Sequence, residues 1–160
     1  MKTVVALAIA TLYTSVAFAQ KPIKEPFPGE SQDYPPYPQG ELCALFPVRV
    51  MVDGKQNAIY FPSGRQMIVG NGSVTVTNVD TGKSLSLSTT GRYSERLLTD
   101  GTWQLETNGR QLFFSYPQDV DGPALTFATG QASMIYDVAS DTVTSLRLSG
   151  QSVDVCQALK

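Results

Sequence analysis

The stretch TDGTWQLETNGRQLFF, residues 99–114, decides the fold class. Between its Asp-Gly and Asn-Gly pairs, Trp103 and Leu105 alternate with polar residues. An apolar–polar alternation of period two is typical of a half-buried β-strand. Asn-Gly and Asp-Gly pairs adopt the positive φ angles of tight type I′ hairpin turns. The stretch therefore predicts one strand bounded by two turns.

The same pattern recurs along the chain from residue 43 onward. Short alternating runs, of which SLSLS at 84–88 is the most regular, are separated by glycine-containing segments: Asp53-Gly54, Asn71-Gly72, Asp80-Thr81-Gly82 and Asn108-Gly109. Such runs at spacings of about 8–12 residues indicate a sandwich or barrel, and no stretch shows a helical period. We predict an all-β fold, an antiparallel meander of about nine or ten strands forming a β-sandwich or barrel closed by one disulfide.

The two cysteines, Cys43 and Cys156, lie just before the first predicted strand and just after the last one. A bridge between them would close a loop whose entropy contributes about 4–5 kcal/mol. Two free thiols and an intermolecular bridge are the alternatives. Neither cysteine has a neighbouring histidine or basic cluster that would make it a reactive thiolate, so we expect a structural disulfide.

The first 19 residues read as a signal peptide. Lys2 supplies a basic start, residues 4–10 an apolar core, and Ala17-Phe18-Ala19 a small-x-small cleavage site. A membrane anchor would need about 20 apolar residues, and Thr11 ends the apolar run too early for that. We therefore expect a secreted, extracellular protein, and export permits the disulfide.

Residues 20–41 differ in composition from the rest, because they hold six of the ten prolines. Proline lacks an N–H donor and fixes φ, so this segment is predicted to be a semi-rigid, extended N-terminal spacer. An alternative is a recognition segment in which Phe27, Tyr34 and Tyr37 dock on a partner or back onto the domain. The β domain is then residues 42–160.

Histidine is absent from the chain. Its absence excludes Ser–His–Asp and Cys–His catalysis and histidine-based zinc sites, and two cysteines cannot form a structural zinc site. The D-x-D-G fragment at 119–122 lacks the further ligands of a calcium loop and is predicted to be a turn. We expect no catalytic residue, metal or cofactor. The carboxylates that a glycosidase pair would require are Glu95, Glu106, Asp137 and Asp141.

Aromatic residues are the candidates for a binding surface, including a carbohydrate platform. Trp103 is in phase with Leu105, which predicts burial, whereas Tyr60 is out of phase with its apolar neighbours. Adjacent Phe113 and Phe114 face opposite sides of a strand, so one of them is exposed or covered by another segment. The predicted ligand or partner surface comprises Tyr34, Tyr37, Tyr60, Phe113 and Tyr116. A possible glycosylation sequon, Asn71-Gly72-Ser73, falls in a predicted turn.

Three segments resemble small secreted all-β proteins of bacteria and fungi that carry one terminal-to-terminal disulfide. They are CALFPVRV at 43–50, DGTW at 100–103 and VDVCQAL at 153–159. The resemblance spans residues 43–159 and implies the fold predicted above, but it implies no activity.

Charge and export together define the expected function. The chain has 12 basic and 14 acidic residues and no basic cluster, which argues against a nucleic acid partner, and no membrane insertion is expected. We predict a secreted non-catalytic binding or interaction protein with a surface, host-interaction or matrix role. Its partner is an unknown extracellular protein or carbohydrate. The alternatives are a small carboxylate-dependent hydrolase acting on polysaccharide, or a secreted enzyme inhibitor.

Overall fold

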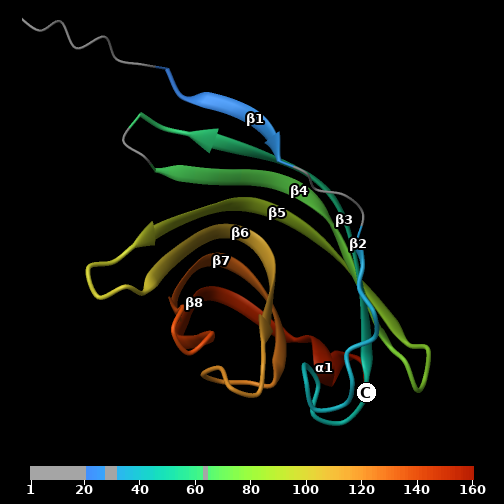
Figure 1. Ribbon diagram of the computed structural model, residues 1–160. Coiled ribbons are helices and arrows are strands. Elements are labelled where there is room, and N and C mark those ends of the chain that lie inside the picture. Colours follow the sequence, from blue (N-terminus) through green and yellow to red (C-terminus); the bar gives the residue numbers. More distant parts are fainter. Residues whose placement is uncertain (1–20, 28–31, 63–64) are drawn as a thin grey trace, which may run out of the picture.

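A computed structural model describes residues 21–27, 32–62 and 65–160 and shows one antiparallel sheet with a short terminal helix (Figure 1). The elements are β1 (Ile23–Phe27), β2 (Gln32–Asp33), β3 (Val48–Tyr60), β4 (Gln66–Asn78), β5 (Ser84–Leu97), β6 (Trp103–Ser115), β7 (Ala124–Asp137), β8 (Thr142–Asp154) and α1 (Val155–Ala158). The strand order is β1-β3-β4-β5-β6-β7-β8, with β2 also paired to β3. The predicted all-β antiparallel meander is confirmed. The predicted signal peptide lies outside the described residues.

The sheet is open, because β1 and β8 stand at the two ends of the strand order. It has eight strands among the described residues, and six of them are 13 or 14 residues long. The prediction of more and shorter strands placed turns at Asp-Gly and Asn-Gly pairs that instead lie inside strands: Gly54 in β3, Gly72 in β4 and Gly109 in β6. Of the pairs and triplets read as turns, those ending in Gly82 and Gly101 do turn the chain, with φ of 73° and 88°.

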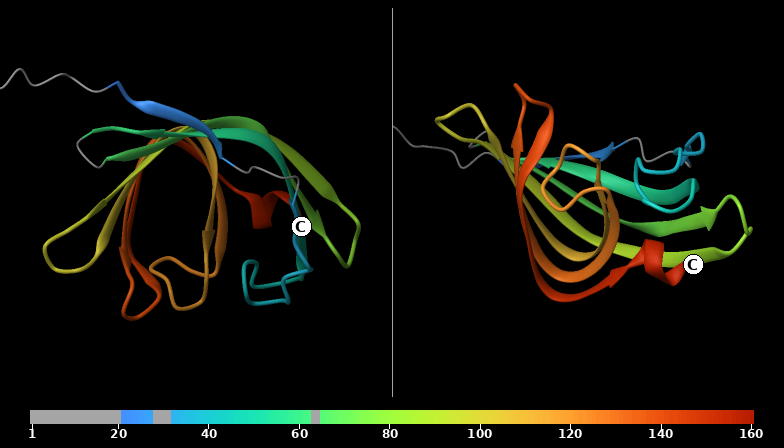
Figure 2. Two further views of the ribbon diagram at one scale, coloured as in Figure 1. Left: turned by 45° about the horizontal axis from the view of Figure 1, so that its top comes forward. Right: turned by 90° about the horizontal axis from the view of Figure 1, so that it is seen from below.

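Five glycines form a continuous row across the sheet. Gly70, Gly91, Gly109, Gly130 and Gly150 are direct cross-strand neighbours from β4 to β8. A Cβ atom at Gly109 would overlap the Thr90 carbonyl oxygen, and one at Gly130 would overlap that of Ser149. Glycine therefore permits a backbone approach that any other residue would block. The long strands β6–β8 curve into an arch (Figure 2). We call these five residues the glycine row.

Pairing between β5 and β6 ends beside the glycine row, at Thr90 and Arg110. On the disulfide side of the row, the first part of β5 stays paired with β4, which is paired with β3, whereas β6 stays paired with β7. Leu85 of β5 and Leu112 of β6 nevertheless pack against the same buried cluster. The part of the sheet on this side of the glycine row, which we call the near half, thus encloses a core between its two groups of strands.

The core of the near half is a cluster of apolar side chains around the disulfide, with the buried Asn78 amide donating to the Leu159 carbonyl oxygen at its edge. Cys43 and Cys156 are bonded, as predicted, with Cα atoms 5.6 Å apart. The buried members of the cluster are Leu42, Cys43, Phe46, Val48, Val50, Val74, Val76, Leu125, Val155 and Leu159. Helix α1 brings its buried residues into this core, and Asp154 caps it by accepting a hydrogen bond from the Gln157 amide at 3.0 Å.

A second, smaller core joins β6, β7 and β8, where Phe113, Ala128 and Ala132 pack with Leu146 and Leu148. The segment 116–123, which contains the D-x-D-G fragment, is a connection between β6 and β7 as predicted. The Asp119 carboxylate accepts hydrogen bonds from the Tyr116 and Val143 amides, both at 2.7 Å. These bonds tie the connection to the start of β8. The Asp119 carboxylate therefore serves to hold this connection in place.

The proline-rich segment lies against the β domain wherever the structure describes it. Strands β1 and β2 pair with β3, and Tyr34 and Tyr37 pack on the near-half core. Asp33 forms an ion pair with Arg49 of β3. The segment is thus not a free spacer in its described part, and the alternative of docking back onto the domain matches the structure. The prolines are compatible with pairing because β1 and β2 lie at the edge of the sheet.

Across the described ranges, no helix is long and apolar enough to span a membrane.

Candidate functional site

The part of the sheet beyond the glycine row, which we call the far half, exposes two faces of different chemistry. Successive residues of a strand point to opposite faces, and direct cross-strand neighbours share a face. One face carries the neighbouring residues Leu97, Trp103 and Tyr136 of β5, β6 and β7. It is continuous with the second core, so we call it the apolar face. The opposite face is polar. Ser94 and Glu106 are direct cross-strand neighbours on it, and the same row of neighbours ends at Arg147 of β8.

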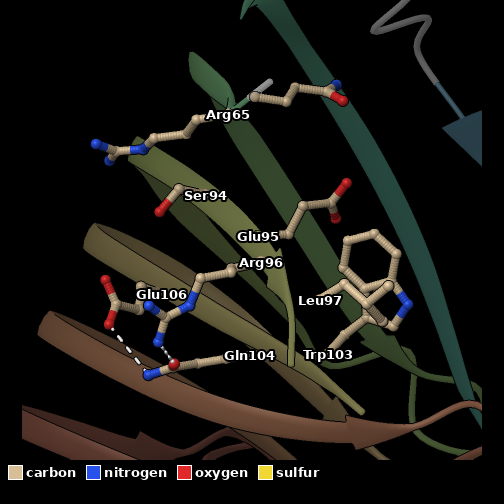
Figure 3. Close-up of a pocket in the computed structure, with 9 residues that line it drawn as sticks. Arg65, Ser94, Glu95, Arg96, Leu97, Trp103, Gln104 and Glu106 are labelled. Atoms are coloured by element: carbon tan, nitrogen blue, oxygen red, sulfur yellow. Dashed lines mark hydrogen bonds between the residues drawn. The ribbon is translucent and has the colours of Figure 1, made fainter. Parts of the chain in front are cut away.

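A hollow of about 620 Å³ lies where the apolar face meets the rim of the sheet, and we call it the Trp103 pocket. Figure 3 shows Glu95, Leu97 and Trp103 projecting to one side of the strands, and Arg65, Ser94, Arg96, Gln104 and Glu106 to the other. Leu97 is 57% exposed although it lies beside the half-buried Trp103. The predicted phase of Trp103 is confirmed by its position, but its ring is only partly covered. The pocket therefore offers an accessible apolar surface.

Glu95 is the carboxylate on the same side as Trp103. It accepts a hydrogen bond at 2.7 Å from the hydroxyl of Tyr93, its neighbour two positions away on the same face. Partial burial, and then this hydrogen bond, raise the pKa of Tyr93 well above its usual value. The phenol thus stays protonated and keeps donating to Glu95. The carboxylate keeps its second oxygen for another donor.

A chain of hydrogen bonds spans the pocket on the polar side (Figure 3). Arg96 donates from Nη2 to Gln104 Oε1 at 2.6 Å, and Gln104 donates from Nε2 to Glu106 Oε1 at 3.2 Å. Gln104 is held by both bonds. The chain therefore fixes the orientation of the Gln104 amide and holds a guanidinium and a carboxylate at the mouth of the pocket.

The four carboxylates named for a glycosidase pair do not converge. Glu95 is the neighbour of Leu105 and Glu106 is the neighbour of Ser94, which places the two carboxylates on opposite faces. Asp137 accepts hydrogen bonds from the Ala139 amide and the Ser140 hydroxyl within its own turn. The hydrogen bond from the Ala139 amide lowers the pKa of the Asp137 carboxyl. Asp141 accepts a hydrogen bond from the Tyr136 hydroxyl. Among the described residues, no group of acidic or cysteine side chains could hold a metal ion.

The five residues predicted to form a ligand surface do not all lie together. Tyr34, Tyr37 and Tyr116 pack on the near-half core, with the Tyr34 and Tyr37 ring centroids 6.3 Å apart. Phe113 is 9% exposed and belongs to the second core, so it is a core residue. Tyr60 is 40% exposed and lies outside the Trp103 pocket. Sequence reasoning missed this pocket, although Leu97 and Trp103 stand on either side of the same Asp100-Gly101 turn.

The possible glycosylation sequon at Asn71 lies within β4 and not in the predicted turn. Asn71 is exposed and is the neighbour of Thr90, on the polar face. Its side chain is therefore accessible from that face.

The chain matches no protein-family model, and no curated protein or solved structure is detectably similar to it.

Proposed function

We propose that this is a secreted, non-catalytic binding protein that holds a carbohydrate ligand in the Trp103 pocket. The observation that carries the proposal is the pairing of Trp103 with exposed Leu97 in a hollow otherwise lined by hydrogen-bonding side chains. A sugar ring presents an apolar C–H face and a rim of hydroxyl groups. An indole face fits the former, and Glu95, which projects to the same side of the strands, supplies an acceptor for the latter.

One feature supports a binding role over hydrolysis. Hydrolysis of a glycosidic bond uses two carboxyl groups that flank the same bond. Here the two carboxylates at the pocket, Glu95 and Glu106, leave opposite faces of the sheet. Export is supported by the signal-peptide pattern of residues 1–19, and the Cys43–Cys156 disulfide is compatible with an oxidising compartment.

Trp103 makes the proposal directly measurable, because it is the one tryptophan in the chain. Titration of the native protein with neutral and acidic oligosaccharides should change its tryptophan emission, since a sugar stacked on the indole removes water from it. Calorimetry with the same sugars then gives the affinities. Trp103→Ala should weaken binding about tenfold or more if a stacked sugar ring contributes as much as a stacked base, for which the loss is of the order of 1–3 kcal/mol.

The matched control is Tyr60→Ala, which removes an exposed aromatic side chain outside the pocket. It should bind with the native affinity. Equal binding by Trp103→Ala and the native protein would contradict the proposed site. Turnover of any oligosaccharide that Glu95→Gln abolishes, with the fold preserved, would replace the proposal with the hydrolase alternative.

A further inference from the structure

Five of the six arginines gather on one polar surface, although they are scattered between residues 65 and 147: four lie on the polar face of the far half, and Arg110 lies directly across the glycine row from them. They are Arg65, Arg92, Arg96, Arg110 and Arg147. Arg92 and Arg96 share a face because they are four residues apart on β5. Strand register places Arg110 and Arg147 on that face, and Figure 3 shows Arg65 on the same side as Arg96. We call this surface the arginine face.

The positive charge of this face is not neutralised by the protein itself. All five arginines are exposed, and none forms an ion pair with any acidic residue in the described part of the chain. In the cross-strand rows that carry Arg92, Arg96, Arg110 and Arg147, Glu106 is the one described acidic residue. The sixth arginine, Arg49, is paired with Asp33 at the other end of the sheet. A protein with excess acidic residues thus keeps one cationic surface.

The arginine face is also concave and is continuous with the Trp103 pocket. A hollow of about 550 Å³ is lined by Arg65, Arg92 and Arg147 together with polar side chains that include Asn108, Gln131, Ser133 and Ser149. Arg65, Ser94 and Glu106 line this hollow and the Trp103 pocket alike. The shared residues lie on the polar side of the strands, whereas Trp103 projects to the other side at the very start of β6, so one extended ligand contacts both sites by passing around the rim of the sheet.

We propose that the ligand is an acidic polysaccharide, that its carboxylate or sulfate groups bind the arginine face, and that the chain passes around the rim of the sheet so that one sugar ring stacks on Trp103. This inference rests on the proposed carbohydrate-binding function. Guanidinium groups pair bidentately with carboxylate and with sulfate-like oxyanions. The interleaved amides and hydroxyls of Asn108, Gln131 and Ser133 suit the hydroxyl groups of the sugar chain.

The dimensions of the face favour a chain with several charges over a single small anion. Arg92 on β5 and Arg147 on β8 are three strands apart, a separation of about 14 Å at the usual strand spacing. Single-stranded nucleic acids bind to surfaces where aromatic rings stack on successive bases. The described cross-strand rows of the arginine face contain no aromatic residue, and the nearest rings are at its edges: Phe61 beneath Arg65, 5.6 Å from the guanidinium carbon, and Trp103 on the other side of the strands. A face with two separate rings and many amides and hydroxyls favours a glycan over a stacked strand of bases.

Calorimetric titration of the full-length mature protein tests the inference with four probes: polygalacturonate oligosaccharides, dextran sulfate, neutral dextran and single-stranded DNA of similar charge. We expect binding to at least one acidic glycan, weaker binding at higher salt, and little binding to neutral dextran. The double variant Arg92→Gln, Arg147→Gln should lose about tenfold or more in affinity for that glycan, since it removes two charge-assisted contacts.

The control variant Arg49→Gln, Lys83→Gln removes the same positive charge away from the arginine face and should bind as the native protein does. An equal loss in the two variants would mean that net charge alone acts, and would overturn the inference. Neutral dextran bound as tightly as the acidic glycans, with a Trp103 response and no effect of the arginine variants, would overturn the inference and leave the proposed function standing. Binding of DNA in preference to every glycan would overturn both. Thermal melting of each variant checks that its fold is intact.

Discussion

The two halves of the sheet are built from the same strands and differ in what covers them. In the near half, Val48, Val50 and Val76 are completely buried beneath α1, the segment that follows β2, and the disulfide. In the far half, the same β5 ends with Leu97 more than half exposed, and β6 begins with a partly exposed Trp103. The strand pattern is thus common to both halves, whereas the coverage is not.

This difference separates stability from binding. Uncovered apolar surface and unpaired arginines stabilise nothing in the free protein, and clustered like charges oppose folding. The near half compensates with a buried apolar core and a covalent bridge that joins residues 113 positions apart. The glycine row marks the boundary between a half that holds the fold and a half that is free to contact a ligand.

The largest expected effect tests the near half through its bridge. Replacing Cys43 and Cys156 together with serine should lower the free energy of unfolding by about 4–5 kcal/mol, because the unfolded chain regains the entropy of a very long loop. Urea unfolding without reductant measures the change. A loss below about 0.5 kcal/mol, the usual size of a surface effect, would show that the near half does not depend on the bridge.

The next effect compares one leucine in each half. Leu125→Ala should cost about 3–4 kcal/mol, because Leu125 is completely buried in the near-half core and its loss leaves a cavity. Leu97→Ala should cost less than about 0.5 kcal/mol, because Leu97 is mostly exposed. Chemical unfolding of both variants checks the pair. A Leu97 variant as destabilised as the Leu125 variant would mean that the far half is a second structural core and not an open surface.

The glycine row can be tested against a turn glycine. Both Gly109 and Gly101 have positive φ, 130° and 88°, so alanine is strained at either position. Only at Gly109 would the added Cβ also overlap a neighbouring backbone, since Gly101 has no heavy atom within 4 Å of that position. Gly109→Ala should cost about 2–3 kcal/mol and Gly101→Ala about 1 kcal/mol. Equal losses would show that conformation alone, and not close approach of strands, requires glycine in the row.

The same glycines mark where sequence reasoning succeeded and where it stopped. Period-two alternation predicted an all-β meander, and the position of Cys43 and Cys156 predicted the bridge. Asn108-Gly109 does not form the predicted turn. Glycine after asparagine suits a tight hairpin turn, but it also suits a position within a strand where the neighbouring backbone comes too close for a side chain. The distinction depends on whether another glycine lies opposite, and that is a matter of register.

The candidate site was hidden from the sequence for a similar reason. The alternation of Trp103 and Leu105 with polar residues predicts the face on which Trp103 lies. The sequence does not tell which part of that apolar face another segment will cover. Arg147 was already visible as the polar residue between two leucines of a strand. Its proximity to Arg92, 55 positions earlier, follows from four strands pairing in register. Charge clustering across a sheet is a tertiary property, so a search for basic runs missed it.

The smallest expected effect is on pH dependence, and it involves one tyrosine in each half. Partial burial, together with the nearby Tyr116, raises the pKa of Tyr37 to about 12, and burial with the Glu95 bond raises the pKa of Tyr93. In the unfolded chain both ionise near the ordinary value of 10.0. Above that pH the folded state therefore binds more protons than the unfolded state, so stability is full below pH 10 and falls as pH rises toward 12.

Urea unfolding at intervals across this window, with the disulfide intact, measures the decline. Tyr37→Phe and Tyr93→Phe should each flatten part of it, because phenylalanine keeps the ring and removes the ionisable hydroxyl. Tyr60→Phe is the control. If Tyr37→Phe flattens the decline and Tyr93→Phe does not, the phenol of Tyr93 ionises freely in the folded protein. The far half would then be more open to water than its structure indicates, and the contrast between the two halves would sharpen.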